Sequence, residues 1–112
     1  MVTFEWDGSK ATTNERKHGV GFVEASTVFD DPIAMSSPDI EHSEDEPRWV
    51  TIGRSASGRM ILVIHTMDSA ESDEEVIRII SARRTTPRET RQYNDCRFRK
   101  FRPPLFRKIC PV

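Results

Sequence analysis

The chain has 112 residues, with 36% hydrophobic and 31% charged side chains and a formal net charge of −1. This length suits one domain with a modest core, and the longest apolar run, residues 60–64, is too short to cross a bilayer. No secretory signal is visible at the N-terminus, so we expect a cytoplasmic protein without membrane contact. Two cysteines and three histidines provide no disulfide scaffold or zinc framework, and we expect no metal and no cofactor.

Charge is distributed unevenly along the chain. Residues 1–95 hold 11 basic and 18 acidic residues, a balance of −7, whereas residues 96–112 hold six basic residues and no acidic one. We therefore expect a single domain over residues 1–95 without the overall positive field of most nucleic-acid-binding proteins, so any polyanion site must be local. We interpret the basic and aromatic segment 96–112 as a poorly ordered extension, with an RNA- or membrane-surface-binding arm as the alternative.

The first elements in chain order are a strand and a helix. Apolar and polar residues alternate over residues 2–6, which is typical of a short strand. Asp7 or Ser9 can cap a helix over residues 9–17. Gly19 suits the left-handed residue at which such a helix ends.

A second helix and an acidic loop follow. Residues 22–29 place apolar side chains at helical spacing, which predicts an amphipathic helix that ends at Asp30-Asp31-Pro32. Residues 33–35 predict a brief edge strand. Residues 36–47 contain many acidic residues and two prolines, and we expect a surface loop there.

Three strands make up the next part of the chain. Residues 48–53 alternate in polarity, and a turn containing Gly58 leads to a strand over residues 59–66, so the pair predicts an antiparallel hairpin. The strand over 59–66 is apolar on both faces and is expected at the centre of the sheet. After a second acidic loop, residues 76–83 give the strongest strand signal in the sequence.

A final helix over residues 88–93 completes the predicted domain. Thr85 or Thr86 can cap it, and Pro87 suits its first turn. The element order predicts an α+β fold: an antiparallel sheet of about four strands with two N-terminal helices and one C-terminal helix. We expect the helices to pack on one face of this sheet and the other face to stay open for a ligand.

The strand over 76–83 carries more arginine than a buried strand favours. Arg78 and Arg83 differ by five positions, so they point to opposite faces of a regular strand. Both can serve one site only if the strand bulges near Ser81, or if Arg83 lies beyond the end of the strand.

Basic residues near the ends of elements indicate the chemistry. They are Lys17, His18, Arg48, Arg54, Arg59, His65, Arg78 and Arg83. Guanidinium groups bind phosphate bidentately, and a cationic set can promote attack of a ribose 2′-oxygen on the adjacent phosphorus without a metal. In this hypothesis Lys17 or His18 transfers protons, and Arg48, Arg78 and Arg83 hold the phosphate. The competing interpretation is that such arginines are solvated or paired with nearby acids.

Several blocks of the sequence occur together in a characteristic order. In the N-terminal half they are Phe4-Glu5-Trp6-Asp7 with Lys10, then Asn14 and Lys17-His18-Gly19-Val20, Phe22-Val23-Glu24-Ala25 and Val28-Phe29-Asp30-Asp31-Pro32. In the C-terminal half they are Arg48-Trp49-Val50-Thr51-Ile52-Gly53, Gly58-Arg59 and Ile77-Arg78-Ile79-Ile80-Ser81-Ala82-Arg83, followed by Glu89 and Tyr93. Over residues 4 to 93 the chain resembles the BrnT toxins, and the segment after Asp95 falls outside the pattern.

The resemblance implies a RelE-like fold and a ribonuclease toxin of a type II toxin–antitoxin system that inhibits translation. It implies RNA as substrate and a BrnA-like ribbon-helix-helix antitoxin as partner, with operator DNA bound only through the toxin–antitoxin complex. The matching site positions are Lys17, His18, Arg48, Arg78 and Arg83. The alternative function is a non-catalytic interaction module, an inactive toxin homologue that binds an antitoxin-like partner, in which the extension after residue 95 marks lost activity.

Overall fold

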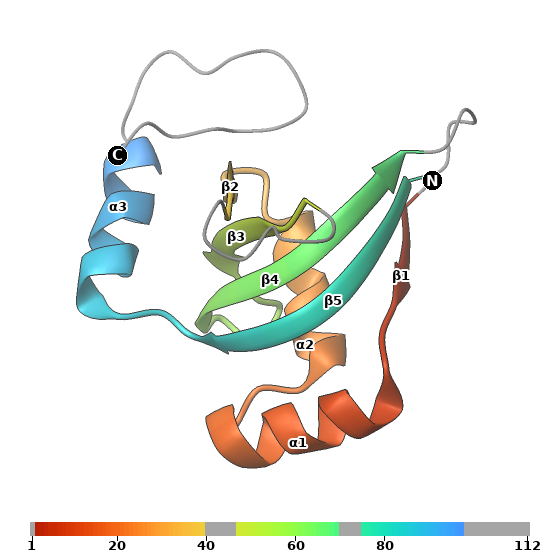
Figure 1. Ribbon diagram of the computed structural model, residues 1–112. Helices are drawn as coiled ribbons and strands as arrows, with labels where there is room; N and C mark the ends of the chain where they lie inside the picture. The colour runs from red at the N-terminus through yellow and green to blue at the C-terminus, as the bar shows by residue number, and fades with distance from the viewer. Residues whose placement is uncertain (1, 40–46, 70–74, 98–112) are drawn as a thin grey trace.

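The computed structural model describes residues 2–39, 47–69 and 75–97, which form a five-stranded sheet with three α-helices and a short 3-10 helix (Figure 1). The elements are β1 (Val2–Glu5), α1 (Gly8–His18), α2 (Phe22–Thr27), η1 (Val28–Asp30), β2 (Met35–Pro38), β3 (Trp49–Arg54), β4 (Met60–Ser69), β5 (Glu75–Arg84) and α3 (Pro87–Arg97). The expected α+β class is confirmed. None of the helices in these ranges is long and apolar enough to cross a membrane.

The sheet has the strand order β1-β5-β4-β3-β2, so β4 is central as expected. Strands β2 to β5 form the predicted antiparallel array. The N-terminal strand β1 adds a fifth member that runs parallel to β5, a pairing that the long intervening chain permits. β2 begins at Met35 and includes residues assigned to the loop, while loop residues 40–46 and 70–74 lie outside the described residues.

Local sequence signals determine both ends of α1. Asp7 is the N-cap, and its carboxylate accepts hydrogen bonds from two backbone N–H groups of the first turn. Gly19 follows the helix with a φ of 72°, the left-handed conformation that glycine adopts at low cost, and its N–H donates to the Glu15 carbonyl. These caps place Lys17 and His18 in the last turn of α1.

Each face of the sheet carries its own hydrophobic cluster. The larger cluster, on the face covered by α2, contains Val20, Phe22, Ala25, Val28, Ile61, Val63, Ile77, Ile79 and Ala82. The smaller cluster contains Met35, Ile52, Leu62 and Tyr93. Leu62 alternates with Ile61 and Val63 along β4, so the two clusters lie on opposite faces. The expectation that all helices share one face is therefore wrong, because Tyr93 of α3 packs on the second face.

A β-bulge interrupts the pairing of β4 with β5. Ile64 pairs with Ser81, whereas His65 pairs with Ile79, so Ile80 is inserted between the two pairs. The insertion falls next to Ser81, where the sequence required a bulge if the two arginines of β5 were to share a face.

The bulge brings Arg78 and Arg83 to the same face of the sheet. Arg78 lies opposite Thr66 and Arg83 lies opposite Leu62. Opposite residues of an antiparallel pair share a face, and positions 62 and 66 of β4 have the same parity. Four residue steps still separate the two arginines, which corresponds to about 13 Å along the strand.

One side chain of α1 closes the edge of β5 that β1 does not reach. β1 pairs only with residues 75–78 of β5. Farther along, Asn14 donates from Nδ2 to the Ala82 carbonyl at 2.8 Å and accepts the Ala82 N–H at Oδ1 at 3.2 Å. Asn14 also donates to the Val20 carbonyl at 3.0 Å and accepts Ser81 Oγ–H at 3.2 Å. The buried amide thus takes the place of a neighbouring strand residue.

We predict that Asn14→Ala lowers the free energy of unfolding by roughly 1–3 kcal/mol, because it leaves the buried N–H and C=O of Ala82 without their partner. Urea denaturation measures the change. Thr12→Ala, at an exposed position of the same helix, is the matched control and should change the stability by less than about 0.5 kcal/mol. An Asn14→Ala variant as stable as the parent would show that the edge of β5 does not depend on this amide.

Glu24 connects α2 to the turn between β3 and β4. Its carboxylate accepts hydrogen bonds from Ser55 Oγ at 2.8 Å, Ser57 Oγ at 2.6 Å and Arg59 Nε at 2.9 Å, and it also pairs with Arg59 Nη2. The hydrogen bond from Arg59 contributes most to lowering the pKa of Glu24 to about 2. Arg59 therefore stabilises the fold, and its guanidinium is already engaged.

We predict that Glu24 makes folding stability depend on pH in the acid range. Its pKa falls from 4.5 in the unfolded chain to about 2 in the folded chain, so its stabilisation is complete above pH 4.5 and is lost as the pH falls toward 2. Glu24→Gln should lower stability at pH 7 and reduce the loss between pH 4.5 and 2, as measured by denaturant titrations at stepped pH. Glu15→Gln, at an exposed position of α1, should retain the parent's loss of stability in this range.

Candidate functional site

A hollow of about 310 Å³ lies between α1 and the bulge of β5. Its lining residues are Ser9, Lys10, Thr13, Asn14, Lys17, His18, Ile80 and Ser81. The size is at the lower end of the range for small-molecule sites. The lining combines two lysines and a histidine with hydroxyl groups, and Ile80 supplies an apolar patch. Such a surface suits a ligand that combines an anionic group, which the basic side chains bind, with a flat ring, which packs on Ile80.

Lys17 and His18 are the two predicted site residues that line this hollow. Lys17 is exposed and His18 is half-buried. They follow Asn14 by about one helical turn, so the anchoring of Asn14 to Ala82 holds this end of α1 against β5. Figure 1 shows the C-terminal ends of α1 and β5 at the same side of the molecule.

Arg83 lies at the end of β5 and is held by Glu89 of α3. Arg83 Nη1 and Nη2 donate to the two carboxylate oxygens at 2.9 and 2.8 Å, and Nη1 also donates to the Arg84 carbonyl at 3.2 Å. Glu89 in turn accepts the Thr86 N–H at 2.9 Å, while the Glu89 N–H donates to Thr86 Oγ1 at 3.2 Å. This reciprocal capping box confirms Thr86 as the cap of α3. The Glu89 carboxylate therefore both caps the N-terminus of α3 and orients Arg83.

The ion pair does not use all the donors of Arg83. A guanidinium has five N–H donors, and the hydrogen bonds within the described residues use three of them. The Nε–H and the second Nη2–H remain, and they lie along one edge of the guanidinium plane. That edge can bind a phosphate bidentately while Glu89 holds the other edge. The hydrogen bond to Glu89 raises the pKa of Arg83, so the group stays charged.

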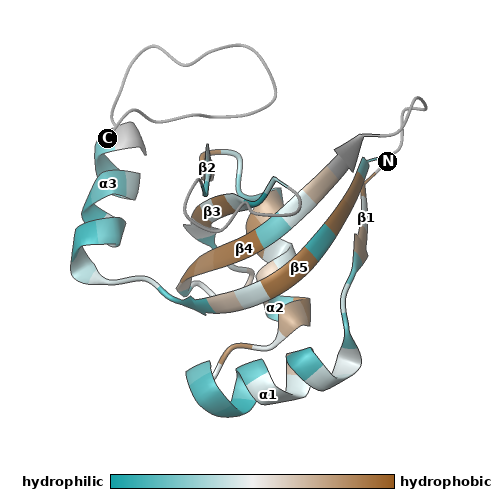
Figure 2. Ribbon diagram, in the orientation of Figure 1, coloured by the Kyte–Doolittle hydropathy of each residue, from teal (hydrophilic) through white to brown (hydrophobic). Residues whose placement is uncertain are grey.

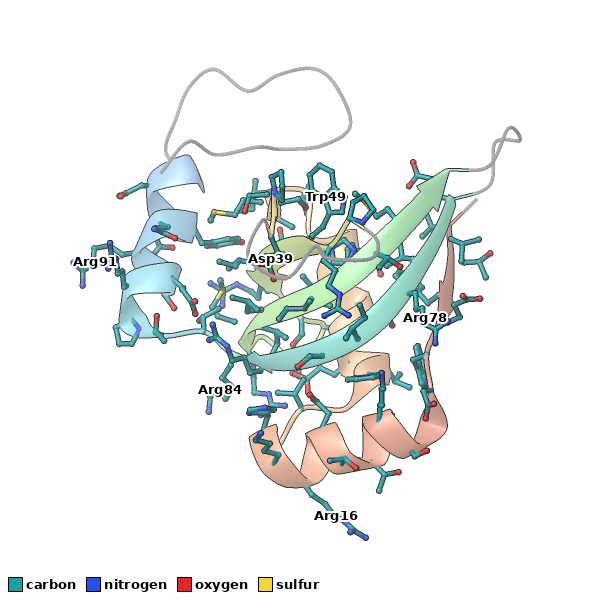
Figure 3. The ribbon with its side chains drawn as sticks, in the orientation of Figure 1. Arg16, Asp39, Trp49, Arg78, Arg84 and Arg91 are labelled. Carbon is teal, nitrogen blue, oxygen red and sulfur yellow. The ribbon has the colours of Figure 1, made fainter. Side chains whose placement is uncertain are left out.

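The remaining predicted site residues lie farther away. Arg78 is opposite Thr66 near the other end of β5, and its guanidinium is 4.0 Å from the Glu5 carboxylate in an exposed pair. Figure 3 shows it projecting beside β1. Arg48 directly precedes β3, and its carbonyl accepts the Asp39 N–H at 2.8 Å. The structure therefore does not gather the five predicted residues around one point.

Three other basic residues from the sequence stabilise the fold. Arg59 pairs with Glu24, and Arg54 donates to the Gly58 carbonyl at 3.1 Å. His65 is fully buried, with Nε2 2.6 Å from Thr51 Oγ1 and its ring packed edge-on against Phe29. A buried imidazole cannot contact RNA, so His65 has no direct part in the site.

Lys10, Ser81 and Glu89 are site residues that the sequence hypothesis did not include. Lys10 and Ser81 line the hollow, and Glu89 orients Arg83. The capping-box spacing from Thr86 to Glu89 was visible in the sequence, but its link to Arg83 needs the turn between β5 and α3. Among the described residues, no group of three or more His, Cys, Asp or Glu side chains is placed to hold a metal.

The fold and the candidate site together define a small α+β protein with a hollow between α1 and the bulge of β5 that is lined by Lys10, Lys17 and His18. The sequence model of one family, described as ribonuclease toxin BrnT of type II toxin–antitoxin systems, matches residues 6–89. A crystal structure of the ribonuclease toxin BrnT from Brucella abortus is similar, with 26% identity, a TM-score of 0.55, and coverage of 77% of this chain and 97% of that chain. No match was found among the curated proteins. The chain belongs to the BrnT family of ribonuclease toxins.

We predict a measurable coupling between Arg83 and Glu89 in a double-mutant cycle with Arg83→Ala and Glu89→Ala. Because the Arg83 side chain is 37% exposed, solvent screening limits the coupling to roughly 0.5–1 kcal/mol. The free energy of unfolding of the four proteins gives the value. Thr86→Ala removes the cap without the ion pair and should leave the coupling unchanged. Additive single mutants would show that Glu89 does not orient Arg83.

Proposed function

We propose that this chain is a toxin that cleaves RNA endonucleolytically, without a metal ion, and thereby inhibits translation. The observation that carries the proposal is the position of Lys17 and His18 in the hollow beside the β5 bulge, in a chain that matches a family of ribonuclease toxins over residues 6–89. Arg83 lies at the same end of β5 and keeps one guanidinium edge available to a ligand.

The proposed reaction is transesterification at phosphorus. The ribose 2′-oxygen forms a bond to the adjacent phosphorus, and the bond from phosphorus to the 5′-oxygen of the next nucleotide breaks. A base accepts the 2′ proton and an acid protonates the leaving oxygen, which yields 2′,3′-cyclic phosphate and 5′-hydroxyl ends. Histidine is well suited to exchanging protons near neutral pH, so we assign proton transfer to His18 or Lys17, and phosphate contact to whichever of the two does not transfer the proton.

The arginines divide between the reacting phosphate and its neighbours. Arg83, at the end of β5, is proposed to stabilise the charge that builds up on the phosphate oxygens in the transition state. Arg78 is about 13 Å away along β5 and cannot share that phosphate. We therefore propose that Arg78 and Arg48 bind flanking phosphates of an RNA strand that crosses the sheet face.

The proposed partner is a BrnA-like antitoxin with a ribbon-helix-helix DNA-binding domain. Family membership supports an antitoxin partner and an RNA substrate. In this proposal the antitoxin neutralises the toxin, and operator DNA is bound only through the complex. Because the proposed effect is inhibition of translation, we place its action in the cytoplasm.

We predict that the purified chain cleaves RNA in the presence of EDTA. Lys17→Ala should lower the cleavage rate about 100-fold or more, as expected for loss of a proton-transfer or phosphate-binding group. Arg83→Ala should lower it by about 100- to 1,000-fold, as for loss of a preorganised charge stabiliser. Gel analysis of a defined RNA gives the rates, and end labelling identifies the cyclic or 3′-phosphate products.

Arg54→Ala is the matched control, because Arg54 lies at the β3–β4 turn and its loss should leave cleavage unchanged. Thermal unfolding of each variant separates loss of chemistry from loss of folding. A requirement for a divalent ion, or no cleavage by the parent chain, would contradict the proposal. Unchanged growth on induction, combined with tight antitoxin binding, would instead favour the non-catalytic interaction module.

A further inference from the structure

A second hollow lies where β5 passes into α3, apart from the residues of the proposed site. It measures about 440 Å³ and is lined by Thr85, Pro87, Thr90, Arg91 and Asn94. Thr85 Oγ1 and Thr90 Oγ1 lie 2.7 Å apart and hydrogen-bond to each other. All lining side chains except Pro87 can donate hydrogen bonds. The hollow is therefore suited to a ligand rich in oxygen acceptors.

Arg91 lines this hollow, and Arg84 and Arg88 are the chain neighbours of its lining residues Thr85 and Pro87. All three are exposed, and none of them forms an ion pair with another described residue. Arg88 precedes Arg91 by one helical turn, which places their side chains on adjacent parts of α3. Figure 3 shows Arg84 and Arg91 projecting outward on the same side of the molecule. Of the acidic residues of α3, Glu89 is engaged by Arg83, and Asp95 follows Arg91 by about one turn without an ion pair to a described residue.

The positive charge of these three arginines exceeds the negative charge of Asp95, the acidic residue of α3 that Arg83 does not engage. The domain as a whole is acidic, with the balance of −7 over residues 1–95. The three guanidinium groups, which form no ion pair with a described residue, nevertheless create a local positive field. Figure 2 shows that α3, the end of β5 and the nearby end of α1 are all strongly hydrophilic. A polyanion approaching this side meets a polar, cationic surface that leads to the hollow beside α1.

We propose that Arg84, Arg88 and Arg91, with the hollow between β5 and α3, bind the phosphates of single-stranded RNA next to the cleaved bond. The inference rests on the proposed ribonuclease function, and it adds a substrate-binding surface outside the catalytic residues. Arg84 is the last residue of β5 and lies opposite Ile61, on the other face of the sheet from Arg83, so a strand bound at Arg83 reaches Arg84 by passing over the end of β5. RNA supplies phosphates for the arginines and ribose and base acceptors for the threonine hydroxyls and Asn94. An acidic peptide also offers carboxylates and backbone carbonyls, and the match to a family of ribonuclease toxins favours RNA.

The salt dependence of binding tests this surface directly. The ligand is a single-stranded 2′-O-methyl RNA of about ten nucleotides, which lacks the nucleophile for cleavage and matches typical site sizes. Each phosphate contact to a single strand contributes about 0.7 to the slope of log K against log salt. The full chain carrying Arg84→Gln, Arg88→Gln and Arg91→Gln should therefore lose about 2 from the slope, and Arg91→Gln alone about 0.7.

Arg16→Gln is the control, because Arg16 is exposed and projects from α1 away from the sheet (Figure 3). It should leave the slope unchanged. A triple variant with the parent's slope overturns the inference, and if that variant instead loses binding to polyglutamate, the surface serves an acidic protein partner. A parent chain that does not bind the RNA also overturns it. A parent that binds through these arginines but cleaves no RNA keeps the binding surface and rejects the ribonuclease proposal.

Discussion

The contact between Asn14 and the backbone of Ala82 is the constraint on which the site depends. β1 is only four residues long and pairs with the first part of β5, so the rest of that edge needs another partner. Asn14 supplies both a donor and an acceptor in the geometry that a strand would offer. Because the amide belongs to α1, the same contact that completes the sheet also sets the distance from α1 to β5. The hollow with Lys17 and His18 exists because a helix occupies the place of a strand.

The bulge of β5 is the second constraint, and it acts on the arginines. A regular strand would send Arg78 and Arg83 to opposite faces, and one of them would point into the cluster beneath α2. Inserting Ile80 keeps both charges on the face away from α2 and exposes an apolar side chain beside the hollow. Bulges recur near functional sites because they change the direction of a side chain without breaking the sheet.

Much of the fold could be predicted from local patterns. Strand alternation, helix periodicity and the capping residues Asp7, Gly19 and Thr86 located most elements. The parallel pairing of β1 could not be predicted, because nothing in its short sequence selects β5 over another strand. The role of Asn14 was equally hidden, since an asparagine in a polar helix looks exposed until the opposing backbone is known. Charge allowed a set of candidate site residues to be proposed, but the sequence could not separate Lys17 and His18, which line the hollow, from Arg78, which lies near the other end of β5.

Glu89 pairs with Arg83 and still leaves part of its guanidinium group available to bind a phosphate. An arginine without a partner is mobile, and fixing it on the substrate costs conformational entropy. Glu89 is itself fixed by the capping box of α3, so its contact orders Arg83 when the protein folds and not when substrate binds. The Glu89 carboxylate binds the Nη1 and Nη2 atoms of Arg83 and leaves the Nε–H and the second Nη2–H for a ligand. The carboxylate also cancels much of the long-range field of Arg83, so attraction of a polyanion must come from neighbouring arginines that lack such a partner. Precise positioning and electrostatic attraction are thus assigned to different side chains of the same surface.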